Sequence, residues 1–436
     1  MVIRIKKSSH VGFISLLTLL SALLFLRYSF NIEIPRIILT AVIIVIALIG
    51  SPNEILAISL CCIPLHEAID FYIALVACAI VLVVKTSRLM RSSIAIILGV
   101  TVVLWEALHC LQTDVSIMSF LVSVIPMAFL IMIMHCDVSE VDYPFIVRSL
   151  TFVSAIISMV ILVNHLAQAD FNFVNGVLSI QRLGQFSEDE VLLGGRLNPN
   201  AIGIINVLGI TALLQLRFID QHRKSDYFIA IVLIIFGVLT ASKTFFICLL
   251  LMIFLLFLGQ VGNAYQKVRF TFIVLVVALV AWVLLNLLFP STLEYFISRF
   301  QVADLSTGRN QLMIKYNDFI SSHPSILLFG IGAADMPNKV TGIYNIANNV
   351  PHNSIQEIII AWGLFGLLLI AFLIAIMIME AKRYGRRKIL LNFIPLIIIF
   401  TKSLAGQLIT SRYSMLMLVL AYLSLCQNFK VTDQIN

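Results

Sequence analysis

The residues with the clearest capacity for chemistry are a histidine and a few cations in an otherwise apolar chain. His352 and Asn353 directly precede a long apolar run. Ser354 and Glu357 have the S-x-x-E spacing of a helix-capping box, so we expect a helix to begin at about Ile355. His352 would then lie just outside the helix end, where an imidazole that titrates near neutral pH can accept a proton. The alternative interpretation is that His352 only completes the end of the helix.

Arg196 lies close to a second predicted helix end. Asn198 or Asn200 can cap that helix, and Pro199 fits its first turn. The free amide groups of a helix N-terminus together with a guanidinium group can bind an anion. The alternative is an arginine that interacts with lipid headgroups at the membrane surface.

Three more cations are candidates for the same chemistry. Lys243 separates two apolar runs, and its simplest interpretation is an interfacial anchor. Arg299 and Arg309 lie in a long polar segment. The apolar pattern predicts a short amphipathic helix over 309–321 that stops before Pro324, with Arg309 in its first turn. A cation there opposes the helix dipole, so a bound anion would explain the placement.

The composition identifies the class of protein that must position these residues. The chain has 436 residues, of which 61% are hydrophobic and only 12% are charged. Apolar runs near the length of a membrane span recur along the chain, which indicates a polytopic helical membrane protein. The excess of 29 Lys and Arg over 22 Asp and Glu lies mostly in short loops. The positive-inside pattern explains it better than nucleic-acid binding does.

The apolar runs predict an all-α bundle with about 14 membrane-spanning helices, or 12 if one short pair is re-entrant. They cover approximately 11–28, 35–50, 53–66, 70–85, 93–111, 115–134, 144–164, 201–216, 227–241, 244–259, 271–289, 355–379, 389–404 and 406–426. With this topology every basic cluster faces the cytoplasm. The long segment 291–353 then lies on the opposite side.

Several familiar catalytic motifs are missing from the sequence. It contains no Walker A loop, no G-x-S-x-G nucleophile elbow and no H-E-x-x-H zinc motif. The seven cysteines have no metal-ligand or disulfide spacing and lie mostly within apolar runs. Nucleotide hydrolysis, serine hydrolysis and zinc chemistry are therefore not indicated.

Over approximately residues 190–380 the chain resembles the bacterial O-antigen polymerase and O-antigen ligase superfamily. The most specific feature is His352-Asn353 followed, after nine residues, by Gly363-Leu364-Phe365-Gly366, which matches the superfamily pattern H-N-x9-G-x-x-G. Further similar segments follow the family order: Gly195-Arg196 with Pro199-Asn200, Ser306 to Arg309, and Gly330-Ile331-Gly332. Lys243 departs from the pattern, because many relatives carry arginine there. The charge is kept but the bidentate fork of arginine is lost.

The resemblance implies a GT-C-like membrane fold and an inverting, metal-independent glycosyltransferase that needs no cofactor. It would transfer a glycan from undecaprenyl diphosphate to an acceptor hydroxyl at the periplasmic face of the bacterial inner membrane. His352 would be the base, and Arg309 and Arg196 would stabilise the leaving diphosphate. The expected substrate-binding residues are Arg299, Lys243, Asn353 and Glu357, although Glu357 also fits the capping box.

The same resemblance divides the chain into N-terminal helices (1–190), a catalytic region (191–380) that includes the periplasmic segment 291–353, and a C-terminal hairpin (381–436). Its expected partners are an undecaprenyl-diphosphate-linked oligosaccharide, membrane lipid, and a chain-length regulator and flippase of the same pathway, with no nucleic acid.

Three functions are compatible with these features. An O-antigen polymerase joins lipid-linked repeat units, whereas an O-antigen ligase transfers the finished polymer to lipid A-core. Both reactions break the same diphosphate bond, and we favour the polymerase because this chain carries no extra domain. A polysaccharide flippase or transporter is the alternative of another class. It would predict charged residues deep within the spans, and the predicted spans are almost uncharged at their centres.

Overall fold

The chain forms an all-helical bundle, seen in a computed structural model that describes residues 10–30, 32–86, 93–113, 115–168, 172, 180–184, 198–259, 264–301, 309–344, 351–385 and 389–429. Seven helical stretches in these ranges are long and apolar enough to cross a membrane: Val11–Ser29, Ile94–Thr113, Ile117–His135, Tyr143–Ala167, Pro199–Ile219, Lys267–Leu288 and Ser354–Tyr384. The predicted all-α membrane architecture is confirmed at this level. Shorter apolar helices of 10–17 residues lie between and after these seven, which is why the sequence predicts a larger number of spans.

Each predicted apolar run corresponds to a helix in the described part of the chain. These helices are α1 (Val11–Ser29), α2 (Arg36–Ile49), α3 (Pro52–Leu65), α4 (Phe71–Lys85), α5 (Ser93–Thr113), α6 (Ile117–His135), α7 (Tyr143–Gln168), α9 (Pro199–Gln215), α10 (Lys224–Leu239), α11 (Lys243–Gly259), α12 (Ala264–Leu288), α17 (Ser354–Ala381), α18 (Leu390–Ser403) and α19 (Ser414–Cys426). The last run was predicted to begin at 406. That boundary is wrong, because 404–413 is a loop whose polar groups bind buried charged side chains.

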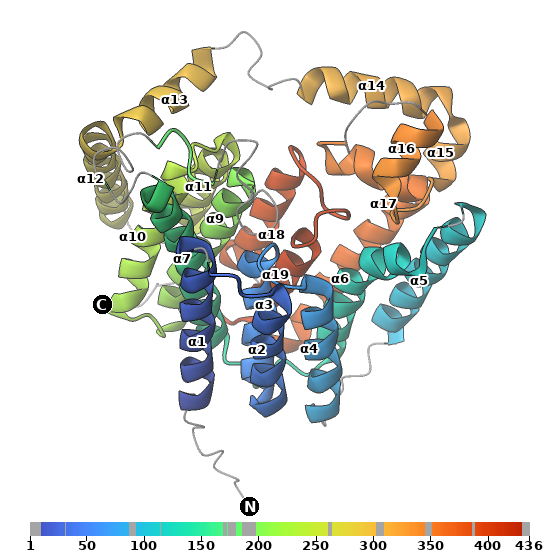
Figure 1. Cartoon of the computed structure of the whole chain (residues 1–436), viewed down its shortest axis with the longest axis horizontal. Coiled ribbons are helices and arrows are strands. Elements are labelled where there is room, and N and C mark those ends of the chain that lie inside the picture. Colours follow the sequence, from blue (N-terminus) through green and yellow to red (C-terminus); the bar gives the residue numbers. More distant parts are fainter. Residues whose placement is uncertain are drawn as a thin grey trace, which may run out of the picture.

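The polar segment between α12 and α17 forms four short helices. They are α13 (Pro290–Gln301), α14 (Arg309–Ser322), α15 (Pro324–Phe329) and α16 (Met336–Tyr344). The predicted helix over 309–321 is confirmed as α14, and Pro324 begins the next helix. Figure 1 shows α13 to α16 along one end of the bundle, with α13 on one side of it and α14 to α16 on the other, whereas α1, α2 and α4 extend to the opposite end.

At that opposite side of the bundle the helices end next to the basic loops. We call this side the basic end. Lys85, at the end of α4, donates hydrogen bonds to the carbonyls of Leu48 and Gly50 at the end of α2. The phenol of Tyr384, just after α17, accepts a hydrogen bond from the amide of Val138 between α6 and α7. These bonds join helix ends next to the described basic residues Lys85, Lys382 and Arg383.

A glycine break in α17 brings the short helices close to the bundle. Gly363 has φ +69°, and a Cβ there would lie 2.1 Å from the carbonyl oxygen of Leu328. Gly330, at the end of α15, also has a positive φ of +77°. The amide of Ile331 donates to the carbonyl of Ile360 at 2.8 Å, so the two segments are joined through their backbones. Only glycine combines this φ with such close backbone approach. The break thus seats α15 against α17.

Candidate functional site

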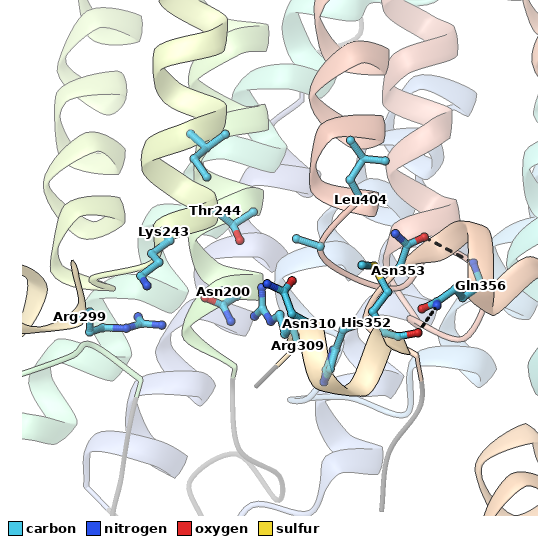
Figure 2. Close-up of a pocket in the computed structure, with 13 residues that line it drawn as sticks. Asn200, Lys243, Thr244, Arg299, Arg309, Asn310, His352, Asn353, Gln356 and Leu404 are labelled. Carbon is cyan, nitrogen blue, oxygen red and sulfur yellow. Dashed lines mark hydrogen bonds between the residues drawn. The ribbon is translucent and has the colours of Figure 1, made fainter. Parts of the chain in front are cut away.

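A pocket of about 230 Å³ lies among the ends of helices on the side of the α13–α16 segment (Figure 2). The first turns or caps of four helices contribute to it: Asn200 of α9, Lys243 and Thr244 of α11, Arg309 and Asn310 of α14, and Asn353 and Gln356 of α17. Helix N-termini carry free amide groups and a partial positive charge. Four of them converge here. The pocket therefore has a positive potential before any side chain is counted.

Cationic side chains strengthen that potential. Lys243, Arg299 and Arg309 line the pocket, and none of its described lining residues is Asp or Glu. Burial lowers the pKa of Arg309, and the neighbouring charge of Arg299 lowers it further. Arg309 still keeps its proton at physiological pH, because arginine is far too basic to lose it there. Repulsion between the two guanidinium groups is relieved by an anion, so the pocket favours a ligand with several negative charges.

The turn between α10 and α11 positions Lys243. Ala241 has φ +45°, a left-handed conformation that is uncommon for a residue with a side chain. Two arginines bind this turn: Arg299 Nη1 donates to the carbonyl of Ala241 at 2.7 Å, and Arg182 Nε donates to that of Thr240 at 2.9 Å. These bonds hold the turn so that α11 begins with Lys243 at the pocket wall.

Arg182 is a functional candidate that the sequence analysis did not identify. Its Nη2 donates to Asn200 Oδ1 at 2.9 Å, and Ser242 Oγ donates to the same oxygen at 2.8 Å. Its pKa is lowered to about 10, mainly by burial and then by Arg299. No motif or spacing marks Arg182. The general depletion of basic residues on this face of the membrane was the one available signal.

His352 lies on the other side of Arg309 from Arg299 and Lys243 (Figure 2). Gln356 Nε2 donates to the carbonyl of Met313 at 2.8 Å and to Asn317 Oδ1 at 2.7 Å, which ties α14 to the first turn of α17. This attachment places Arg309 within electrostatic reach of His352.

The surroundings of His352 favour its neutral form. The ring keeps contact with solvent, but the protein around it removes enough water to lower its pKa, and the charge of Arg309 lowers it further. A neutral imidazole can accept a proton, whereas an imidazolium cannot. At neutral pH His352 is therefore available as a base.

Five of the seven residues predicted from the sequence line this one pocket: Lys243, Arg299, Arg309, His352 and Asn353. They come from several segments spread over about 110 residues of the sequence, from Lys243 to Asn353, so their meeting is a tertiary result. Arg196 lies outside the residues that the structure describes. Glu357 is described but does not line the pocket.

The predicted capping box at the start of α17 is wrong. Asn353 is the N-cap, and its Oδ1 accepts hydrogen bonds from the amides of Ile355 at 2.8 Å and Gln356. Ser354 instead donates its hydroxyl to the carbonyl of Gly406. Asn353 caps the helix in place of Ser354, because its side chain, one residue earlier, accepts hydrogen bonds from the first amides of α17.

Glu357 is fully buried and binds the 404–413 loop. Its carboxylate accepts hydrogen bonds from the amides of Leu408 at 2.6 Å, Ile409 at 3.2 Å and Thr410 at 2.7 Å, and from the Thr410 hydroxyl. These four hydrogen bonds occupy the acceptor sites of the carboxylate, so none is left for a substrate. Glu357 therefore shapes the site from behind the pocket wall.

No protein-family model and no curated protein matches the chain. The chemistry of the pocket is therefore inferred from its own geometry. Convergent helix N-termini and three cations suit a diphosphate or a similar polyanion. A neutral histidine beside them can take a proton from a hydroxyl group that attacks next to that polyanion.

Proposed function

We propose that this protein is a glycosyltransferase that joins undecaprenyl-diphosphate-linked repeat units into a surface polysaccharide. The observation that carries the proposal is the meeting of Lys243, Arg299 and Arg309 with His352 at four helix N-termini. Transfer from a polyprenyl diphosphate needs two things at one place: positive charge for the leaving diphosphate and a base for the acceptor hydroxyl.

The reaction would be a direct displacement at the anomeric carbon of the donor sugar. His352 takes the proton of the acceptor hydroxyl as its oxygen forms the new bond to that carbon. The bond from the carbon to the diphosphate oxygen breaks, and its electron pair leaves with the diphosphate. Because attack and departure occur on opposite sides of the carbon, the configuration inverts.

The arrangement in Figure 2 suits this displacement. Arg299 and Lys243 lie to one side of Arg309, and His352 lies to the other. A diphosphate held by Lys243 and Arg299 would leave the sugar close to Arg309 and facing His352. The cations would provide the charge stabilisation that metal ions provide in many phosphate-cleaving enzymes.

Topology supports a periplasmic site in a bacterial inner membrane. The positive-inside pattern assigns the basic end to the cytoplasm. The pocket and the α13–α16 segment lie at the other end of the bundle. A lipid-linked donor would enter from the membrane with its prenyl chain among the apolar helices. A flippase of the same pathway would deliver it, and a chain-length regulator would act on the product.

Two alternatives use the same chain differently. A ligase would transfer the finished polymer to lipid A-core, and it would need the same base and cations. A flippase needs charged or polar groups at the middle of the membrane. The buried carboxylates Glu106 and Glu357 instead bind backbone amides of the 333–334 and 408–410 segments. This pattern favours an enzyme.

The test is a gel of surface glycan from a strain that lacks the protein, with and without the restored gene. The polymerase predicts that the deletion leaves core bearing a single repeat unit and that the ladder returns on complementation. Long chains that persist on undecaprenyl diphosphate but never reach the core would identify a ligase instead. An unchanged ladder would contradict both and return attention to transport.

Complementation with His352→Ala supplies the matched test of the site. The polymerase with His352 as its base predicts no ladder, while the variant protein still inserts in the membrane. A full ladder would exclude His352 as the base.

A further inference from the structure

We call the pocket lined by Lys243, Arg299 and Arg309 the cationic pocket. A second compartment of about 100 Å³ adjoins it. The two share part of their lining, including Arg309, His352 and Asn200. The second compartment extends away from Lys243 and Arg299, which line only the first. It reaches the 404–413 loop between α18 and α19. His352 thus lies where the two spaces meet.

The new walls of this compartment are different in chemistry. They include Asn198, Gln407 and Tyr413, which contribute two amide side chains and an aromatic ring rather than cationic groups. Lys402 also lines it, but its ammonium group donates hydrogen bonds to the carbonyl of Gln407 and to Ser414 Oγ. Amide groups beside an aromatic ring are suited to sugar hydroxyls and ring faces, whereas clustered cations are suited to phosphate.

Two buried charged residues hold this loop in place. Glu357 binds three consecutive amides of 408–410 from one side. Lys402 binds Gln407 and Ser414 from the other side. Glu357 is 0% exposed and Lys402 is 7% exposed. A loop fixed by two buried charges presents its side chains in a defined geometry, which is what a binding wall requires.

We propose that the second compartment binds the terminal sugar of the acceptor and presents its hydroxyl group to His352. The inference rests on the proposed glycosyl transfer and adds a division of labour to it. The cationic pocket takes the diphosphate of the donor, and the 404–413 loop takes the acceptor. The compartment and the cationic pocket share His352 in their lining, so recognition would concentrate on the sugar that carries the attacking hydroxyl.

The experiment uses purified full-length protein and lipid-linked repeat units extracted from the deletion strain. One measurement is the binding of undecaprenyl diphosphate alone, which reports the cationic pocket. The other is inhibition of polymerisation by the repeat unit released from its lipid with mild acid. That probe has no diphosphate and can compete only for the acceptor position.

Gln407→Ala is the acceptor variant, and Lys243→Gln is its reciprocal. The acceptor variant should raise the inhibition constant of the free repeat unit by about three- to tenfold, the loss expected for one hydrogen bond. Its affinity for undecaprenyl diphosphate should stay within about twofold, which also verifies folding. Lys243→Gln should do the reverse: weaker undecaprenyl diphosphate binding and an unchanged inhibition constant.

Two outcomes would overturn the assignment, and they differ. If the protein polymerises but Gln407→Ala leaves the inhibition constant unchanged, the acceptor binds elsewhere and the proposed function survives. If the unmodified protein neither binds undecaprenyl diphosphate nor extends repeat units, the glycosyl-transfer proposal fails and the acceptor site fails with it.

Discussion

The cationic pocket and a buried cluster around Glu106 differ in the groups that surround their charged side chains. Glu106, on α5, is fully buried and accepts hydrogen bonds from the amides of Ala333 at 2.9 Å and Ala334 at 2.6 Å, and from Trp362 Nε1 at 2.6 Å. Its charge is satisfied within the protein. In the pocket, Arg309 and its cationic neighbours meet no carboxylate among the lining residues.

The difference separates a charge that stabilises the fold from charges that we propose to act on a ligand. At Glu106 the donors come from α17 and from the segment before α16, so the carboxylate fastens the α15–α16 region to the bundle. Lys339 adds a further tie by donating to the carbonyl of Ile331 at 2.8 Å. Around Arg309 several cations are assembled at a cost in mutual repulsion. A bound anion would recover that cost, and this is the physical basis for assigning a ligand to one region and not to the other.

The largest expected effect comes from removing the central groups of the pocket. Arg309→Ala and His352→Ala should each lower glycan transfer by at least about 100-fold, since in the proposed mechanism each removes a group that acts on the transition state. The measurement is polymerisation of extracted lipid-linked repeat units. Lys315→Ala on the same helix and His323→Ala at its far end are controls outside the pocket and should retain near-normal rates. If both pocket variants remained active, the pocket would lose its catalytic role.

The next effect should appear in stability rather than in chemistry. Glu106→Ala leaves two buried amides and an indole N–H without an acceptor, so it should destabilise the fold by about 3 kcal/mol. Thermal unfolding in detergent measures this. Glu294→Ala, at an exposed carboxylate, should change little. A Glu106→Ala protein of full stability and no activity would reverse the comparison, because it would make Glu106 catalytic.

A smaller effect is expected at Lys243. Lys243→Gln should reduce transfer about tenfold through weaker diphosphate binding, because one cation of several is lost. Lys243→Arg keeps the charge and should stay within about threefold of the unmodified rate. Steady-state kinetics with the lipid-linked substrate decide between them. Equal losses in both variants would show that the shape of the lysine matters more than its charge.

The smallest effect is a shift in pH dependence. In the proposed mechanism His352 is a base and must be neutral, so transfer should fall as the pH drops below its pKa, which burial and Arg309 keep below the ordinary value. Arg309→Gln removes a positive neighbour and should raise that pKa, while Arg309→Lys should not. Modification of His352 by diethyl pyrocarbonate, followed by mass spectrometry at several pH values, measures this even in inactive variants. Identical curves for Arg309→Gln and the unmodified protein would show that the two groups are not coupled.

Local pattern explains why most helices could be predicted. The amphipathic pattern over 309–321 and the stop before Pro324 placed α14 within one residue. Asn198 and Pro199 at the start of α9 were likewise recognised from capping preferences. The start of the last helix could not be predicted from local pattern. Leu408 and Ile409 read as part of an apolar span, although both lie in a loop because Glu357 binds their amides.

The sequence by itself determined the class of protein, the positions of the helices and the cationic and histidine candidates, because apolar length, capping and charge type are local properties. Tertiary structure decided which charged side chains are held by hydrogen bonds in the interior and which line a shared pocket. Arg182, Gln356 and Glu357 gained their roles from contacts with segments that are distant in the chain. Hydrogen-bond satisfaction depends on what a fold brings within about 3 Å, and no local pattern contains that information.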